Sequence, residues 1–264
     1  MSSHDPVKTA ARTLDLFEIF ARERRPLSLT EIAHYLNSPV SSCHALVRTF
    51  QLRGYVYVLD ARKRVYPTKR LATMAESILK HDPVLERVSP MLHDLRDLTR
   101  ETVLLGKRQS DWVVYLDVVE GGQTIRYMAT PGDTKPLHSS AIGKSLLGSL
   151  DSPELNRLLA RLDMPRVTPR TITEREALRE AIASGRQKGY FVTRGENVTD
   201  VMAIAAARSI GGEFYGLALA GPMARMEARF EQCVDALTSA ARRLEGLDSA
   251  VRGLTARSSG SIPL

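Results

Sequence analysis

The sequence predicts an α+β protein with an N-terminal winged helix-turn-helix, a linker helix and a larger C-terminal domain built on an antiparallel sheet. Three helical patterns and two short strand patterns follow one another at the start of the chain. A further helical pattern ends at Asp82-Pro83, and beyond it strands in meander order have helices before and after them. We therefore expect a first domain over residues 1–68, a linker helix over 69–82 and a second domain over 83–264.

The composition is that of a folded protein. Hydrophobic residues make up 43% and charged residues 25% of the 264 positions, which is enough for packed cores. Cys43 and Cys233 are far apart and have no partner at the spacing of a zinc site, which indicates a reducing compartment. No apolar run approaches the roughly 20 residues of a membrane span, and the first residues lack the pattern of a secretory signal. We expect a cytoplasmic protein with no membrane contact, no cofactor and no metal.

Most of the net charge of +7 falls in the first third of the chain. Residues 1–80 contain 13 Lys and Arg against 7 Asp and Glu, whereas the rest of the chain is close to neutral. A small basic domain attached to a neutral one suits a partner with many phosphates. Basic surfaces also occur without such a partner, so the charge alone leaves both alternatives open.

The first two helices are separated by a clear start signal. The first helix is expected over residues 10–21. Its apolar face is formed by Leu14, Phe17 and Phe20. Ser28 and Glu31 fit a capping box, in which the Ser28 hydroxyl accepts from the Glu31 amide and the Glu31 carboxylate accepts from the Ser28 amide. This box predicts a second helix over residues 29–36.

The third helix is expected to begin with Ser38 as its N-cap and Pro39 in the first helical position, and to end near Arg53 with Gly54 in a left-handed conformation. The face expected to be buried contains Val40, Cys43, Leu46, Val47 and Phe50. The exposed face contains Ser41, Ser42, Ala45, Arg48 and Thr49, with His44 at its margin. Short hydroxyl groups near a helix N-terminus suit contacts with phosphates or base edges, and an arginine one turn further on can reach a phosphate.

Two short strands over residues 55–59 and 65–67 enclose a tip with three consecutive basic residues, which is the pattern of a wing. A basic wing suits the DNA backbone or the minor groove. A three-helix unit with a hairpin is also compatible with a protein-interaction module, but the helix spacing, the face of small residues and the basic wing together favour DNA. The residues expected to contact DNA are Ser41, Ser42, His44, Arg48, Arg62, Lys63 and Arg64.

The linker helix has a single apolar stripe, which most simply packs against the protein's own domains. The stripe contains Leu71, Met74, Ala75, Ile78 and Leu79. In the second domain, helices are expected over 84–99, 139–150, 153–162, 173–188 and 225–244. Strands are expected over 102–107, 112–119, 124–129, 190–193, 202–207 and 215–219, with Gly121-Gly122 as a turn before the third of them.

The second domain shows no catalytic constellation in its sequence. The stretch GKS at 143–145 resembles the end of a phosphate-binding loop, but His138 stands where that loop needs its leading glycine. The sequence contains neither HExxH nor GxSxG. His138 and the two serines that follow it do not form a nucleophile with its base, because neighbouring residues seldom face each other. Residues 136–141 suit instead the binding of a carboxylate at a helix start.

Several motifs, in this order, resemble the IclR-type transcription regulators. The N-terminal domain of that family is similar to RTLDLFEIFARERRPLSLTEIAHYLNSPVSSCHALVRTFQLRGYVYV, and its second domain to KPLHSSAIGKSLLGSL, TPRTITEREALREAIASGRQKGYFV and LALAGPMARM. The resemblance spans almost the whole chain and implies a GAF-like effector-binding domain, with its pocket between one face of the sheet and the loops above it. The third helix departs from the family, which usually carries basic residues where this chain has Val40 and Ala45. We therefore expect the DNA contacts to fall on Ser41, Ser42, His44, Arg48 and the wing.

The resemblance also implies a pocket whose polar groups are replaced in this chain. Relatives often carry a Cys and two Ser where this chain has Ala203, Ala218 and Ala220. A small acid would lose hydrogen bonds worth about 0.5–1.5 kcal/mol each against these methyl groups. We expect an effector larger and more apolar than glyoxylate or pyruvate, such as an aromatic acid; the alternative is that the alanines only pack the domain. The effector-binding residues expected are Met128, Ser139, Ser140, Ala141, Ala203, Ala218 and Ala220.

The predicted function is that of a sequence-specific, DNA-binding transcription regulator, not an enzyme, whose operator binding or activity responds to a small organic acid. A two-fold operator and the linker helix imply a homodimer or a dimer of dimers, and RNA polymerase is a further candidate partner. The alternative is a non-catalytic small-molecule sensor or scaffold whose basic head binds a protein or non-specific nucleic acid.

Overall fold

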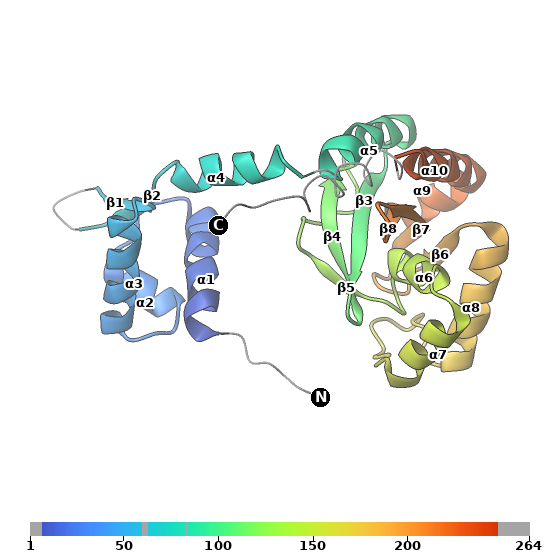
Figure 1. Ribbon diagram of the computed structural model, residues 1–264, viewed down its shortest axis with the longest axis horizontal. Helices are drawn as coiled ribbons and strands as arrows, with labels where there is room; N and C mark the ends of the chain where they lie inside the picture. The colour runs from blue at the N-terminus through green and yellow to red at the C-terminus, as the bar shows by residue number, and fades with distance from the viewer. Residues whose placement is uncertain (1–6, 60–62, 83, 248–264) are drawn as a thin grey trace, which may run out of the picture. The chain divides into compact units, whose positions relative to one another are not determined.

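The computed structural model describes residues 7–59, 63–82 and 84–247 (Figure 1). The chain divides into two compact units, residues 1–81 and 82–264. The first unit has one core, in which Leu16, Leu27 and Ile32 are completely buried, and an antiparallel hairpin beside its third helix. Its elements are α1 (Lys8–Glu23), α2 (Leu29–Tyr35), α3 (Val40–Leu52), β1 (Val56–Val58), β2 (Val65–Pro67) and α4 (Arg70–Leu79). The predicted helix-turn-helix with a wing is confirmed.

The start signals of the helices are correct for α2 and wrong for α3. The capping box of α2 is present: the Ser28 hydroxyl accepts from the Glu31 amide at 3.3 Å, and the Glu31 carboxylate accepts from the Ser28 amide at 2.8 Å. The cap of α3 is Pro39, without a side-chain hydrogen bond. The Ser38 hydroxyl instead donates to the Leu36 carbonyl at 2.9 Å, so it closes the turn after α2.

Two apolar residues expected in the core of the first unit are exposed. Leu14 is 65% exposed, whereas Leu16 is completely buried, because the inner face of α1 passes through residues 16, 19 and 20. Val40 is 49% exposed. It is the first residue of α3 and lies ahead of the packed part of that helix, whose buried side chains begin at Cys43. The remaining predicted stripe lies at least partly inside, and Gly54 has the expected left-handed backbone with a φ of 73°.

The linker helix α4 has no buried residue within its unit. Met74, Ile78 and Leu79 are 42%, 64% and 60% exposed, so the stripe predicted to pack on the protein's own domains forms an apolar surface here. Only Leu71 of the stripe is partly covered. The amphipathic pattern therefore predicts the helix correctly, but not the exposure of its apolar side.

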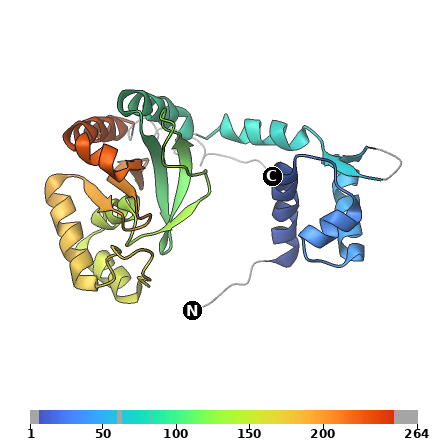
Figure 2. The ribbon, with the colours of Figure 1, turned by 180° about the vertical axis from the view of Figure 1, so that it is seen from behind.

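The second unit is built on a six-stranded antiparallel sheet with the strand order β5-β4-β3-β8-β7-β6. Helices α5 and α10 cover one face, and α6 and α8 cover the other (Figures 1 and 2). Alternate residues of β7 point to the two faces: Met202 and Ile204 into the first core, Ala205 into the second. The strands are β3 (Thr102–Gln109), β4 (Trp112–Val119), β5 (Thr134–Pro136), β6 (Phe191–Arg194), β7 (Val201–Ile210) and β8 (Glu213–Pro222). The helices are α5 (Leu85–Thr99), α6 (Ala141–Gly148), α7 (Ser152–Arg161), α8 (Arg175–Lys188), α9 (Met223–Ala228) and α10 (Phe230–Glu245).

Two elements of the second unit differ from the prediction. Residues 124–129 form no strand; the edge of β4 is paired with β5, and the 124–129 segment is held by a hydrogen bond from the Thr102 hydroxyl to the Tyr127 carbonyl at 2.6 Å. The closing helix is divided at Arg229, whose φ of −122° is not helical. The hydrogen bond from Thr102 accounts for the first difference, and the backbone of Arg229 accounts for the second. Neither feature changes the hydrophobic periodicity from which the elements were predicted.

Candidate functional site

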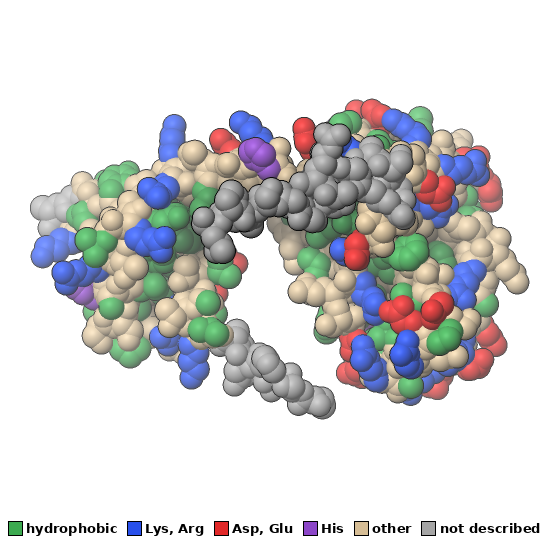
Figure 3. Space-filling model, viewed as in Figure 1, with side chains coloured by type: hydrophobic (Ala, Val, Ile, Leu, Met, Phe, Trp, Pro, Cys, Tyr) green, Lys and Arg blue, Asp and Glu red, His purple; other side chains and the backbone are tan. Residues whose placement is uncertain are grey.

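The exposed face of α3 carries the polar residues expected there. Cys43, Val47 and Phe50 are buried and fix the helix on its unit. The exposed side chains include Ser41, Ser42, His44, Ala45 and Arg48. Figure 3 shows Lys and Arg side chains where the unit presents α3 and the hairpin. The structure thus brings four of the seven predicted DNA contacts together on one helix face.

The wing is formed by β1 and β2. Val58 pairs with Val65, and the Leu59 amide donates to the Arg64 carbonyl at 2.8 Å, which extends the hairpin towards its tip. Lys63 is exposed and has a left-handed backbone with a φ of 53°, as turn residues can have. Arg64 is half-buried, and Arg62 lies outside the described residues. The hairpin therefore presents at least one exposed cation near α3.

A small cavity lies in the second unit between the sheet and the start of α6. Its volume is about 30 Å³. Five of the seven predicted effector-binding residues line it: Ser140, Ala141, Ala203, Ala218 and Ala220. Ser139 lies behind the wall and accepts a hydrogen bond from Asn197, which does line the cavity, at 3.0 Å. Met128 is 68% exposed and is not part of the lining, because the 124–129 segment is not the strand that would have turned it inward.

The floor of the cavity is a surface of methyl groups on three adjacent strands. Ala203 in β7 pairs with Ala220 in β8, and Ala218 in β8 pairs with Leu104 in β3. Ile142 of α6 lies over this floor. The Ser140 hydroxyl accepts from the Gly143 amide at 3.1 Å and so caps α6, which begins two residues later than the sequence predicts.

Four polar side chains of the lining were not predicted: Tyr115, Tyr127, Thr193 and Asn197. They come from β4, β6 and two loops, so no local pattern could have grouped them. Burial raises the pKa of Tyr115, so its phenol stays protonated and can donate a hydrogen bond. None of the described residues that line the cavity is charged.

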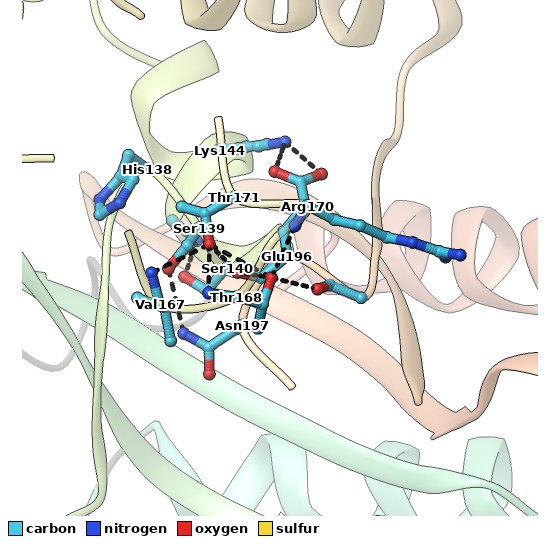
Figure 4. Close-up of polar contacts among 12 residues, drawn as sticks. His138, Ser139, Ser140, Lys144, Val167, Thr168, Arg170, Thr171, Glu196 and Asn197 are labelled. Atoms are coloured by element: carbon cyan, nitrogen blue, oxygen red, sulfur yellow. Dashed lines mark hydrogen bonds and ion pairs between the residues drawn. The ribbon is translucent and has the colours of Figure 1, made fainter. Parts of the chain in front are cut away.

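The GKS stretch and His138 take no part in a catalytic arrangement. Lys144 is buried and paired with Glu196 (Figure 4). His138 is completely buried, its Nε2 lies 3.0 Å from the Pro165 carbonyl, and burial lowers its pKa. Figure 4 shows its ring turned away from the two serines that follow it. Within the described part of the chain, no group of His, Cys, Asp and Glu could hold a metal ion. No helix there is both long and apolar enough to span a membrane.

Two family models match the chain. A model described as the IclR helix-turn-helix domain matches residues 9–60, and one described as the bacterial transcriptional regulator IclR C-terminal matches residues 76–245. The chain is 32% identical to the HTH-type transcriptional regulator BhcR of Paracoccus denitrificans, over 90% of this chain and 86% of the relative.

Solved structures have the same fold. The crystal structure of Thermotoga maritima IclR is 26% identical, with a TM-score of 0.78 over 91% of this chain and 98% of the other. An IclR homologue of Microbacterium hydrocarbonoxydans, solved in complex with 4-hydroxybenzoate, is 23% identical, with a TM-score of 0.72 over 93% and 99% of the two chains. At that identity the second structure shows the fold alone.

Proposed function

The chain belongs to the IclR family of DNA-binding transcription regulators, and we propose that it binds a two-fold operator as a homodimer whose activity responds to a small organic acid. In this proposal residues 1–68 bind DNA, residues 69–82 link the units, and residues 83–264 bind the effector and contribute to oligomerisation. The site of action would be the cytoplasm, where RNA polymerase is a candidate partner.

The observation that carries the DNA-binding proposal is the exposed polar face of α3 beside the wing. Ser41, Ser42 and His44 lie in the first turn and a half of the helix, the part of a recognition helix that meets base edges. Arg48 lies one turn further along the same exposed side. We propose that these four residues read or position the DNA in the major groove, and that Arg62, Lys63 and Arg64 contact the adjacent backbone.

Selection of bound DNA from random sequence tests this proposal. We expect the full chain to enrich a palindrome with half-sites about one helical turn, roughly 10 bp, or a multiple of it apart. Substitution of Ser42 or Arg48 should lower affinity for the selected site more than for unrelated DNA. Recovery of no common sequence would contradict operator binding and would favour a basic head that binds nucleic acid without specificity.

An apolar surface on the first unit supports the homodimer. A groove of about 700 Å³ runs between α1, α3 and α4. Its α3 lining includes Ser42, which we assign to DNA, so we assign only the exposed side chains of Leu14 in α1 and Met74 in α4 to the dimer contact. Ile78 and Leu79 extend the apolar side of α4 beyond the groove. Contact with the same surface of a second copy would remove these side chains from water. Sedimentation of Ile78→Glu tests this: we expect more monomer than in the parent chain or in Glu76→Lys, an exposed control on the same helix.

The cavity of the second unit supports an acid with a flat apolar body. Its floor of Ala203, Ala218 and Ala220 offers apolar area. The Gly143 amide already donates to Ser140, but the amides of Ala141 and Ile142 at the start of α6 can donate to a carboxylate, because a helix leaves its first N–H groups unpaired. The amide of Asn197 adds a polar group at the wall. The fold accommodates such a ligand in at least one relative, which was solved with 4-hydroxybenzoate.

Thermal unfolding with a panel of acids tests the effector class. We expect benzoate and 4-hydroxybenzoate to raise the melting temperature of the full chain more than glyoxylate or pyruvate does, because only the larger acids cover the alanine floor. Ala203→Ser serves as a matched variant that adds one hydroxyl to the floor. Selective stabilisation by the two small keto acids would contradict the proposal.

A further inference from the structure

A buried ion pair joins two walls of the cavity. Lys144 in α6 places its Nζ 2.7 and 2.6 Å from the two carboxylate oxygens of Glu196, which lies in the segment between β6 and β7 (Figure 4). The two side chains are only 3% and 11% exposed.

Burying this pair is costly for both partners. Desolvation lowers the pKa of Lys144 and raises the pKa of Glu196, and in each case it outweighs the opposing attraction of the partner's charge. A buried pair of this kind adds little net stability. It does demand one local arrangement, because the loss of either partner would leave the other charge uncompensated away from water.

The residues that the pair connects belong to the cavity. Ala141 and Ile142 line it from α6, close to Lys144, and Asn197 and Val198 line it from the segment that follows Glu196. The Asn197 amide also donates to Ser139, just before α6, at 3.0 Å. The pair therefore holds two parts of one lining together, although neither of its own side chains lines the cavity.

The main chain of the segment is also held by two threonines. The Thr168 hydroxyl donates to the Gly195 carbonyl at 2.6 Å, and the Thr171 hydroxyl donates to the Glu196 carbonyl at 2.7 Å. These bonds hold the main chain at residues 195 and 196, and the Val198 carbonyl accepts from the Val201 amide at 3.1 Å. The contacts that hold the wall against α6 are therefore the Lys144–Glu196 pair and the hydrogen bond from Asn197 to Ser139. The wall belongs to no helix or strand.

We propose that the Lys144–Glu196 pair controls the opening of the cavity: the Glu196 side chain holds the wall formed by Asn197 and Val198 against α6. A cavity of about 30 Å³ has room for about two water molecules, so an organic acid can enter only if part of the lining moves. When the segment withdraws, both charges regain water, which offsets the contacts that are lost. The pair thus makes the closed arrangement specific while keeping the cost of opening low.

This account predicts opposite effects for single and double substitutions. Glu196→Gln leaves the Lys144 charge buried without a counter-charge, so the segment should open more often. Lys144→Met/Glu196→Met removes both charges, so opening no longer gains their hydration and the segment should stay closed at least as firmly as in the parent. A pair that only stabilised the whole unit would show the same reversal at Cys233, so opening of the wall has to be measured separately from unfolding of the unit.

Alkylation of a thiol on the cavity floor measures the opening. Ala218 is 1% exposed and lines the cavity, so in full-length Ala218→Cys, iodoacetamide reaches the new thiol only when the wall opens. Native Cys233, 1% exposed in the core on the opposite face of the sheet, reports unfolding of the whole unit in the same sample. Peptide mass spectrometry gives the two rates separately.

We expect Glu196→Gln to raise the alkylation rate at position 218 about tenfold or more while the Cys233 rate stays unchanged. The double substitution should return the rate at position 218 to the parent value or below it. The control is Arg194→Met/Glu227→Met, which removes an ion pair of similar length next to the segment. Both side chains of that pair are 46% exposed, so its removal should change neither alkylation rate.

Three results would overturn the proposal: an unchanged rate at position 218 in Glu196→Gln, an equal rise at Cys233, or a double variant that opens as fast as the single one. Should Glu196→Gln not fold, the double variant decides alone, and a rate well above the parent value at position 218 counts against the pair. The inference rests on the proposed function only in assigning the cavity to an effector. Because no ligand is used, failure of every acid in the thermal panel would leave this result intact.

Discussion

The two units of the chain use positive charge in opposite ways. In the first, Arg48 in α3 and Lys63 in the hairpin are exposed, and we propose that they contact the phosphates of DNA. In the second, the Lys144 side chain is 3% exposed and is paired with the carboxylate of Glu196. An exposed charge acts over a distance and is screened by salt, whereas a buried one acts through contact and imposes a local arrangement. A basic composition therefore indicates a partner only where the cations reach the surface.

The largest effect is expected where the exposed charges are removed. Replacement of Arg62, Lys63 and Arg64 by Ala should weaken operator binding about 100-fold at moderate salt, because about three phosphate contacts and their released counterions are lost. The slope of log affinity against log salt should fall by about three. Fluorescence anisotropy titrations over a range of salt concentrations measure both quantities.

The control for the wing removes the same charge from the second unit. Arg157, Arg161 and Lys188 are exposed there, and their replacement by Ala should leave the slope nearly unchanged. A similar fall in slope for both triple variants would show that net charge, and not the position of the wing, governs DNA binding.

The next effect concerns the ligand preference of the cavity in the second unit, where binding should depend on contact and not on charge. Ala218→Ser/Ala220→Ser places two hydroxyls on the cavity floor and should shift the preference between benzoate and pyruvate about tenfold towards pyruvate, because the small acid gains hydrogen bonds and the ring loses apolar contact. Since none of the described lining residues is charged, this preference should be the same at low and high salt. Calorimetry at both salt concentrations checks it, and a strong salt dependence would contradict a contact-driven pocket.

A smaller effect concerns the frame that presents α3. Ser28→Ala should cost the first unit about 1 kcal/mol, because the helix α2 loses the hydroxyl that caps it. Hydrogen exchange of the α2 amides measures the loss. Ser38→Ala is the control: its hydroxyl caps no helix N-terminus and bonds only the turn after α2 among the described residues, so the first-turn amides of α2 and α3 should exchange as in the parent.

The same box predicts a dependence on pH. Hydrogen bonds from the Ser28 amide, the Arg25 guanidinium and the Ser28 hydroxyl lower the pKa of Glu31 to about 2, below its ordinary value of 4.5. The stabilisation is therefore complete above pH 4.5 and is lost as the pH falls through about 2. Exchange of α2 at pH 5 and at pH 3 should show this loss in the parent and much less of it in Glu31→Gln.

The smallest effect belongs to exposed ion pairs. Arg194→Met removes a partner from a pair in which both side chains are 46% exposed, and the free energy of unfolding should change by less than about 1 kcal/mol. Urea denaturation measures it. A loss of several kcal/mol would mean that exposed ion pairs matter to stability in this protein, and would contradict the distinction between its exposed and buried charges.

The sequence by itself determined the features that depend on neighbouring residues. The capping box of Ser28 and Glu31 and the left-handed Gly54 are local, and each is present as predicted. The identity of the family and the order of its two parts also followed from motifs that are continuous in the chain.

Only the tertiary structure decided which side chains meet across long distances in sequence. Lys144 and Glu196 are 52 positions apart, and no pattern in the stretch GKS shows that its lysine is buried in an ion pair. Asn197 reaches the cavity, and Met128 does not, because the folding of two loops sets their positions. Burial depends on the packing of the whole unit. The sequence therefore predicted the helices that contain Val40 and the apolar stripe of α4, but not that these side chains would be exposed.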